Sequence, residues 1–296
     1  MLEFAKAQLS DIHMFREYVS KQTYRTCDYS ACAIFMWRNA FQLEYAVFEN
    51  TLIMKDASVV DGKTSFVVPI GENVDSAIKA IEEYSVFHKI PLRYHAVPVE
   101  GVELLKKHYS NMTVTTDRDF CDYLYDAENM KNFAGRRYSG QRNHINRFLK
   151  LYGEYQFHKI TPENLGRVLA FYEWFRQEYH KDSEFAQEES EKIIELLTHY
   201  ETYQVVGGFI TVDENIIAMA IGEKVYDTLF VHIEKADIRY HGAYQMIVRE
   251  FARAYADETV RYINREEDMG DEGLRTSKLS YHPLQLLEKS VVNITL

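Results

Sequence analysis

The stretch from Thr228 to Tyr255, which reads TLFVHIEKADIRYHGAYQMIVREFARAY, decides the fold that the sequence predicts. Its apolar, β-branched start from Leu229 to Ile233 is typical of a strand. Apolar residues at helix-face spacing follow it, namely Tyr244, Ile247, Val248, Phe251 and Tyr255. A strand that passes through a glycine turn to a helix leaves outward-pointing N–H groups, which attract anions together with the helix dipole.

The turn between this strand and this helix is therefore a candidate binding site for a phosphate, a pyrophosphate or a carboxylate. Its predicted contacts are Arg239, Tyr240, His241, Gly242, Ala243, Tyr244 and Gln245. The alternative is an ordinary turn without a ligand, because strand–glycine–helix turns are common in proteins.

Composition and charge limit the classes of protein to consider. The chain has 296 residues, 46% of them hydrophobic and 27% charged, which is enough for one large or two ordinary domains. A net charge of −11 argues against a protein that coats DNA or an anionic membrane with its whole surface, although a local basic groove is compatible with it.

The cysteines and the N-terminus indicate the compartment. Cys27, Cys32 and Cys121 lack metal-ligand spacing, so we expect buried thiols in a reducing compartment and no metal. We find no signal-peptide pattern and no apolar run long enough to span a bilayer. The sequence thus predicts a soluble cytoplasmic protein.

The order of predicted elements is similar in the two halves of the chain. The second half reads as a strand, two helices, three strands (203–212, 216–225 and 229–233), the helix ending near Tyr255 and a strand at 260–264. The first half repeats this order, with strands at 43–48, 51–55 and 65–68, a helix at 74–88 and a strand at 92–97. We predict an α/β (α+β) protein with domains at 1–125 and 153–296, each a mixed, mostly antiparallel sheet flanked by helices, joined by a basic connecting helix at 126–152.

The most basic stretch of the chain runs from Lys131 to Lys150, with six Lys or Arg and no Asp or Glu. Its apolar residues form one helical face, whereas Arg142, Asn146 and Lys150 lie on another. One interpretation is a helix that presents cations to an anionic substrate, with Arg136, Arg137 and Arg142 as contacts. The others are a solvated basic face and an RNA-binding surface.

Carboxylates follow two predicted strands at their ends. Glu234 follows the central strand, and Glu266, Glu267 and Asp268 come just after Asn264. Adjacent carboxylates raise one another's pKa, which suits a general base near neutral pH. They could equally bind an ammonium group or a metal, or form salt bridges with Arg265, Arg275 and Lys278. His232 is predicted to be a packed core residue.

Several segments carry a family resemblance. Arg239 and Gly242 match the Q/R-x-x-G-x-G/A turn of GNAT acyltransferases, with Tyr244 in place of the usual Gly or Ala. The whole chain resembles the bacterial DUF2156 family, related to the soluble C-terminal domain of phosphatidylglycerol lysyltransferases. The segments that carry this resemblance are DYLY (122–125), FAGRRY (133–138), GAYQ (242–245), INREEDMG (263–270), GLR (273–275) and KLSYHP (278–283).

The resemblance implies two tandem GNAT-like domains and transfer of an aminoacyl group from aminoacyl-tRNA, as in the Fem peptidyltransferases. It implies that Asn264 contacts the pantetheine or peptide-like part of the donor, that Tyr281 donates a proton to the leaving group, and that Arg275 and Lys278 belong to the substrate site. The matching turn of the first half carries Glu72 and no arginine, so we expect one working site, in the second half.

We therefore expect an acyl- or aminoacyltransferase with an acyl-CoA or aminoacyl-tRNA donor and a small or lipid-like amine or hydroxyl acceptor. The alternative is a non-catalytic GNAT-like module that binds an anionic metabolite or tRNA. The bulky Tyr244 in the donor turn favours this alternative.

Overall fold

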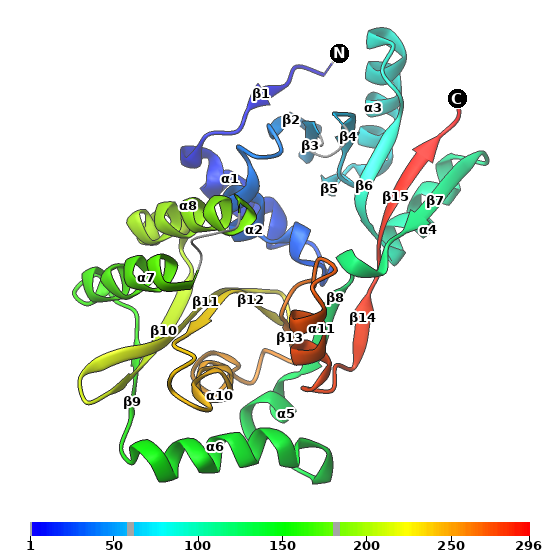
Figure 1. Cartoon of the computed structure of the whole chain (residues 1–296). Helices are drawn as coiled ribbons and strands as arrows, with labels where there is room; N and C mark the ends of the chain where they lie inside the picture. Colours follow the sequence, from blue (N-terminus) through cyan, green and yellow to red (C-terminus); the bar gives the residue numbers. More distant parts are fainter. Residues whose placement is uncertain (1, 58–61, 180–183) are drawn as a thin grey trace. The chain divides into compact units, whose positions relative to one another are not determined.

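The computed structural model describes residues 2–57, 62–179 and 184–296, and the chain divides into two compact units (Figure 1). The first unit holds Met1–Asp122, Glu267–Asp271 and Leu286–Leu296, and the second holds Tyr123–Glu266 and Glu272–Gln285. This division differs from the predicted one in two respects. The C-terminal strand belongs to the first unit, and the connecting segment 126–152 belongs to the second.

The first unit is built on one mixed sheet with the strand order β1-β2-β3-β4-β6-β15-β7, to which β5 adds by pairing with β3. Its strands are β1 (Ala5–Lys6), β2 (Glu44–Phe48), β3 (Thr51–Ala57), β4 (Thr64–Phe66), β5 (Ile70–Gly71), β6 (Arg93–Pro98), β7 (Met112–Thr116) and β15 (Lys289–Ile294). Its α-helices are α1 (Ile12–Val19), α2 (Ala31–Trp37), α3 (Val74–His88) and α4 (Val99–His108).

The second unit has a seven-stranded sheet with the order β14-β8-β13-β12-β11-β10-β9. The strands are β8 (Asp122–Asp126), β9 (Gln156–Lys159), β10 (Val206–Val212), β11 (Asn215–Val225), β12 (Thr228–Ala236), β13 (Tyr262–Asn264) and β14 (Gln285–Leu287). The helices are α5 (Ala127–Asn132), α6 (Ser139–Tyr152), α7 (Leu165–Tyr179), α8 (Glu184–Thr198), α9 (Tyr200–Tyr203), α10 (Ala243–Tyr255) and α11 (Glu272–Leu279).

The two sheets share one topology. In each, three antiparallel strands are followed by a helix and by a strand that runs parallel to the third: β2-β3-β4, α3 and β6 in the first unit, and β10-β11-β12, α10 and β13 in the second. An antiparallel strand closes each set, β15 against β6 and β8 against β13. The predicted α/β (α+β) class, with two mixed sheets flanked by helices, is confirmed.

Helix α10 explains why the chain folds this way around its central turn. Its buried residues Met246, Ile247 and Phe251 form one face, which packs on β10, β11 and β12, while α5 and α6 pack against other parts of the helix (Figure 1). Burial of such a face contributes roughly 25 cal/mol per Å² of apolar surface, and this burial stabilises a helix of only 13 residues.

The sequence analysis assigned no element after the strand at 260–264, where the structure has α11, β14 and β15. All three cysteines are buried thiols, as predicted. Within the described ranges of the chain, no helix combines the length and the apolar character that crossing a bilayer requires.

Candidate functional site

The site forms where strands β12 and β13 part. These parallel strands pair over only three positions, ending at Phe230 opposite Asn264. Strand β13 stops there, whereas β12 continues to Ala236. Beyond this point, the two segments are connected by side chains from the end of β12 and from the loop after β13.

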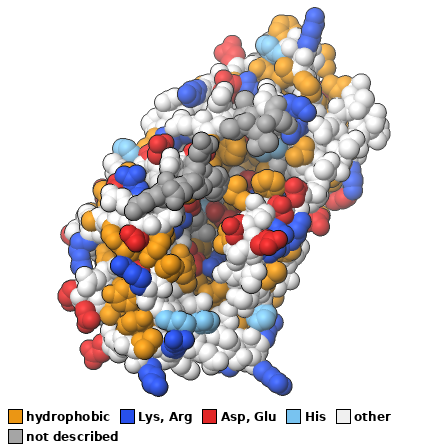
Figure 2. All heavy atoms as spheres, in the orientation of Figure 1, with side chains coloured by type: hydrophobic (Ala, Val, Ile, Leu, Met, Phe, Trp, Pro, Cys, Tyr) orange, Lys and Arg blue, Asp and Glu red, His pale blue; other side chains and the backbone are white. Residues whose placement is uncertain are grey.

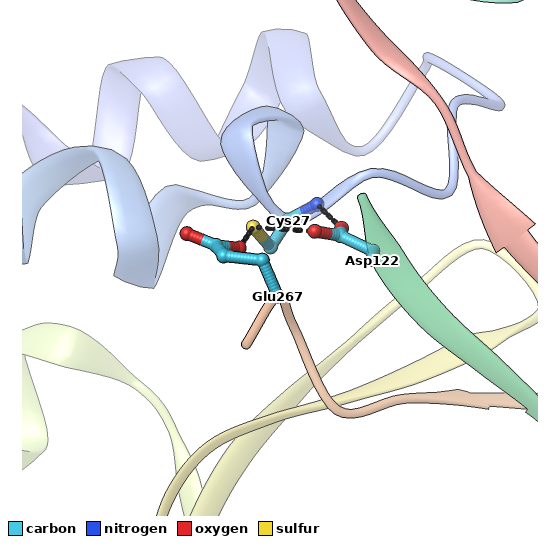
Figure 3. Close-up of side chains that lie close together, drawn as sticks. All are labelled: Cys27, Asp122 and Glu267. Atoms are coloured by element: carbon cyan, nitrogen blue, oxygen red, sulfur yellow. Dashed lines mark hydrogen bonds between the residues drawn. The ribbon is translucent and has the colours of Figure 1, made fainter. Parts of the chain in front are cut away.

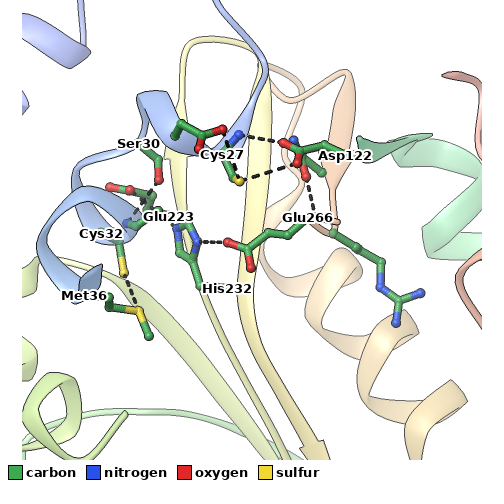
Figure 4. Close-up of polar contacts among 12 residues, drawn as sticks. Cys27, Ser30, Cys32, Met36, Asp122, Glu223, His232 and Glu266 are labelled. Carbon is green, nitrogen blue, oxygen red and sulfur yellow. Dashed lines mark hydrogen bonds and ion pairs between the residues drawn. The ribbon is translucent and has the colours of Figure 1, made fainter. Parts of the chain in front are cut away.

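A row of three ionisable side chains bridges the parting strands (Figure 4). His232 of β12 places Nδ1 2.8 Å from Oε1 of Glu266, and its Nε2 lies 3.5 Å from Oε1 of Glu223 on β11. The side chains of His232 and Glu223 are each 1% exposed, whereas that of Glu266 is 27% exposed. An ionised carboxylate only accepts hydrogen bonds, so with Glu266 ionised the His232 Nδ1–H is the donor of this contact.

Local backbone geometry holds Glu266 in this position. The Glu266 N–H donates to Oδ1 of the fully buried Asn264 at 2.6 Å, and Glu266 has a left-handed φ of 55°. The buried Lys278 ammonium donates to the carbonyl oxygens of Arg265 and Glu266. A non-glycine residue in the left-handed region is typically held there by its surroundings and is enriched at functional sites.

A second network lies on the same two strands. Arg265 donates to Glu234 at 2.9 Å, and its guanidinium lies 4.5 Å from the ring centroid of Tyr281. The Tyr281 hydroxyl is hydrogen-bonded to Gln245 in the first turn of α10. Burial raises the pKa of Tyr281, so its hydroxyl keeps its proton at neutral pH. The structure thus brings the predicted residues Glu234, Gln245, Asn264, Glu266 and Tyr281 to one end of the sheet.

The glycine turn differs from the expected open anion site. The Arg239 guanidinium donates to the Asp237 carboxylate through Nε and Nη2, at 2.7 to 3.1 Å. The His241 N–H donates to the Tyr152 hydroxyl of α6 at 2.9 Å, and the Tyr240 and Ala243 N–H groups donate to carbonyls within the turn. Several of the groups expected to hold a phosphate are therefore already occupied by the chain itself.

Gly242 is required by packing at this turn. It has a φ of 87°, and a Cβ there would lie 2.6 Å from the carbonyl oxygen of His144 on α6. Tyr244 leaves the turn, and its hydroxyl is hydrogen-bonded to the backbone of Ala236 at the end of β12. Burial raises the pKa of Tyr244 to about 12. The tyrosine therefore does not fill the turn itself.

The three consecutive carboxylates have separate partners, which corrects the expectation that they raise one another's pKa. Glu266 faces His232, whereas the fully buried Asp268 accepts from Arg118 at 2.9 Å. Burial alone would raise the pKa of Glu267, but the Lys289 ammonium at 3.1 Å contributes to lowering it to about 2. Glu267 and Asp268 have the surroundings of structural ion pairs.

Glu267 belongs to a buried cluster in the first unit. Figure 3 shows its carboxylate beside Cys27 and Asp122, with donor–acceptor distances to the Cys27 thiol of 3.4 and 3.5 Å. The geometry of these three groups would suit a metal ion. The Lys289 ammonium, 2.9 Å from Asp122 and 3.4 Å from the Cys27 sulfur, already supplies the cation. One ammonium thus faces two carboxylates, those of Asp122 and Glu267.

The predicted cationic contacts have different roles. Arg142 donates to the carbonyls of Phe133 and Gly135, and Lys278 is buried as described. Arg136 and Arg137 are exposed before α6, and Arg275 is half-buried on α11.

Sequence reasoning missed Glu223, Tyr152, Asp237 and the role of His232. Glu223 and His232 each follow a run of mostly apolar residues in their strands, and a polar residue after such a run was the available signal.

Comparisons with known proteins agree with the fold. A family model described as phosphatidylglycerol lysyltransferase, C-terminal, matches residues 21–293. A conserved protein of unknown function from Bacteroides thetaiotaomicron is 30% identical, with each chain covered over 100% and a TM-score of 0.92. A C-terminal DUF2156 domain from Agrobacterium fabrum is 10% identical, with a TM-score of 0.71 over 97% of this chain and 92% of that one.

One curated relative also matches in sequence. An uncharacterized protein of Mycoplasmoides gallisepticum is 23% identical over 175 residues, which are 58% of this chain and 56% of that protein. The match thus spans only about half of the relative's length.

Proposed function

Because the chain belongs to the phosphatidylglycerol lysyltransferase C-terminal family, we propose that it transfers an aminoacyl group from aminoacyl-tRNA to an amine or hydroxyl of a small or lipid-like acceptor. The observation that carries this proposal is the Glu223–His232–Glu266 row at the parting of β12 and β13. It supplies what attack on an acyl carbonyl requires, namely a partly exposed carboxylate that can take up a proton and that a buried imidazole holds in place.

The chemistry assigned to the row is a proton transfer. The acceptor amine or hydroxyl attacks the carbonyl carbon of the aminoacyl ester, and Glu266 takes the proton that the acceptor loses. His232 holds Glu266 in place through its Nδ1–H, and Glu223 balances the imidazole from its far side. The ester bond to the ribose oxygen then breaks, and the proton returns to that oxygen.

The occupied glycine turn favours aminoacyl-tRNA over acyl-CoA. A coenzyme A pyrophosphate would have to compete with Asp237 for Arg239 and with the Tyr152 hydroxyl for the His241 N–H. An aminoacyl-tRNA carries its acyl group on a ribose without a pyrophosphate beside it, so it does not depend on this turn.

In this scheme Tyr281 and Arg265 position the site. The Tyr281 hydroxyl is buried and bonded to Gln245, while Arg265 is held by Glu234. Together they fix the loop from Asn264 to Glu266 against the first turn of α10. Glu234 is thus a positioning residue in our proposal, although the sequence suggested it as a base.

The test compares donors. Purified protein is mixed with radiolabelled aminoacyl-tRNA in the presence of phosphatidylglycerol or small amines, and in parallel with radiolabelled acyl-CoA. We expect label to move from the tRNA to an acceptor and not from the acyl-CoA. Transfer from acyl-CoA alone would refute the choice of donor, and transfer from neither would refute the proposed activity.

The ion pairs that hold Glu267 and Asp268, two of the predicted bases, favour a second candidate, a module that binds an aminoacylated or anionic ligand without turnover. Its signature is saturable binding of aminoacyl-tRNA with no loss of the ester. Wild-type protein and a Glu266→Gln variant then both bind aminoacyl-tRNA and both leave its ester intact. The enzyme hypothesis predicts instead that wild-type protein consumes the ester.

A further inference from the structure

Strand β7 forms one edge of the first sheet, and among the described residues only β15 pairs with it (Figure 1). It is the longest of the four strands that end the two sheets, with five residues against two in β1, four in β9 and three in β14. An edge strand presents unpaired backbone N–H and C=O groups that a further strand can pair with. Many proteins block such an edge with a charge, a proline or a bulge.

Strand β7 has none of these protective features. Its sequence, MTVTT (112–116), contains no charged residue and no proline, and its pairing with β15 is regular over all five residues. Four of the five residues are exposed, among them Val114 at 40%. The right margin of Figure 2, where β7 lies in Figure 1, shows mainly uncharged groups drawn in white. The edge strands β1 and β9, in contrast, carry Lys6 and Lys159.

The alternation of hydrogen bonds shows which backbone groups of β7 face outward. In the register of the β7–β15 pair, Thr295 lies opposite Asn111, and its N–H donates to the Asn111 carbonyl at 3.1 Å. Because antiparallel partners alternate between bonded and non-bonded pairs, every second residue from Asn111 onward bonds to β15. The residues between them direct their N–H and C=O groups to the free edge, and they are Met112, Val114 and Thr116.

This outward pattern is complementary to itself about Val114. When two copies of β7 run antiparallel with Val114 opposite Val114, Met112 of each copy lies opposite Thr116 of the other. All of the outward N–H and C=O groups then have partners. The exposed Val114 side chains meet at the two-fold axis, and on the other face Thr113 lies opposite Thr115 of the second copy. Pairs of β-branched residues and of threonines stabilise neighbouring strands.

The charges beside β7 favour the same arrangement. Antiparallel pairing places the start of one β7 beside the end of the other. The start follows the exposed Lys107 in the last turn of α4, and the end precedes the exposed Asp117. A cation of each copy therefore lies toward a carboxylate of the other, at both ends of the pair.

We propose that β7 pairs with β7 of a second copy of the chain, so that the first sheets of two copies join across a two-fold axis. The partner is a second copy because the edge is complementary to itself in hydrogen bonds, side chains and charge. A five-residue edge buries little surface, so the dimer is a weak one with a roughly micromolar dissociation constant. The pairing is independent of the proposed transfer chemistry.

The test is sedimentation equilibrium over a range of protein concentrations, in which wild type is expected to pass from one chain to two. Val114→Lys places like charges opposite each other at the two-fold axis and raises the dissociation constant at least about tenfold. Val114→Glu does the same, and an equimolar mixture of the two variants restores the dimer. The control Val47→Lys, at an exposed valine of β2, keeps the wild-type dissociation constant.

A covalent cross-link tests the register of the pair. Opposite residues of a bonded antiparallel pair have Cα atoms about 5.5 Å apart, which is within the range of a disulfide. Val114→Cys is therefore expected to give a covalent dimer with oxidised glutathione. Thr115→Cys, which lies opposite Thr113 of the second copy, is expected to give none. The native cysteines are buried and do not compete.

The possible results separate the proposal from its alternatives. Wild type that stays a single chain at every concentration overturns the proposal. A dimer that Val114→Lys leaves unchanged also overturns it, because the contact then lies elsewhere on the protein. A covalent dimer of Thr115→Cys without one of Val114→Cys contradicts the register.

A further variant keeps the test valid if Val114→Lys fails to fold. Val114→Pro removes an outward N–H and leaves the hydrogen bonds to β15 in place, and edge strands tolerate proline at such positions. We expect a wild-type circular dichroism spectrum and a single chain in sedimentation. A folded Val114→Pro that dimerises as wild type does would overturn the proposal.

Discussion

Replacement of Lys289 by methionine should destabilise the protein strongly. The Lys289 ammonium is buried and lies 2.9 Å from Asp122, 3.0 Å from Asp28 and 3.1 Å from Glu267. Methionine has a similar length and no charge, so the variant leaves these carboxylates together without a cation. Breaking a buried ion pair by removal of one partner costs about 3–5 kcal/mol.

The pKa of Glu267 points in the same direction. Its ordinary value of 4.5 is lowered to about 2 in the folded protein, with Lys289 contributing to the decrease. A shift of that size corresponds to about 3 kcal/mol. Because the folded-state pKa of Glu267 is depressed, this stabilisation is present above a pH of about 4.5. It is lost as the pH falls through about 2.

The assay is urea unfolding of wild type, Lys289→Met and the exposed-site control Lys107→Met, followed by circular dichroism. At neutral pH we expect Lys289→Met to lose about 3–5 kcal/mol of unfolding free energy and Lys107→Met to lose almost none. Between pH values of about 4.5 and about 2, the unfolding free energy of wild type falls with decreasing pH more steeply than that of Lys289→Met. A loss below about 1 kcal/mol, or parallel pH slopes, would refute the role assigned to Lys289.

Three smaller changes test the second unit. Gly242→Ala lowers the unfolding free energy, measured by thermal unfolding, by about 2 kcal/mol, because the added Cβ meets the His144 carbonyl and the residue has a φ of 87°. The control Gly140→Ala has open space around it and is neutral or stabilising. Asn264→Ala removes the acceptor of the Glu266 N–H, so kcat of the transfer falls about tenfold with an unchanged KM. A change in KM alone would contradict the positioning role of Asn264. Tyr281→Phe lowers transfer by less than about tenfold, because its buried hydroxyl positions the site and is not the proton donor; a loss of about 100-fold would restore it as the acid.

The repeated fold could be predicted because its signals are local. The helix predicted at 74–88 matches α3 (Val74–His88), and the strand, turn and helix around Gly242 match β12 and α10. Apolar periodicity and glycine turns depend on neighbouring residues in the sequence. The exchange of β15 into the first sheet could not be predicted, because strand pairing at long range leaves no local pattern.

The site residues show the same limit. The sequence placed Glu266 and Asn264 at a strand end, but the partner of Glu266 is His232, which its strand pattern marked as core. Gly242 suggested an open phosphate turn, yet the close approach of α6 is what requires a glycine there. Adjacent carboxylates look alike in a sequence, and only the fold assigns Glu267 to Lys289 and Asp268 to Arg118.

The measurement that tests the central claim most directly is single-turnover transfer of a labelled aminoacyl group from tRNA by Glu266→Gln. The amide keeps an oxygen that accepts from His232 but loses the ability to take a proton. We predict a rate at least about 100-fold below wild type, with an unchanged circular dichroism spectrum, and a wild-type rate for Glu258→Gln at an exposed position. Equal rates for Glu266→Gln and wild type would contradict the role of the Glu223–His232–Glu266 row.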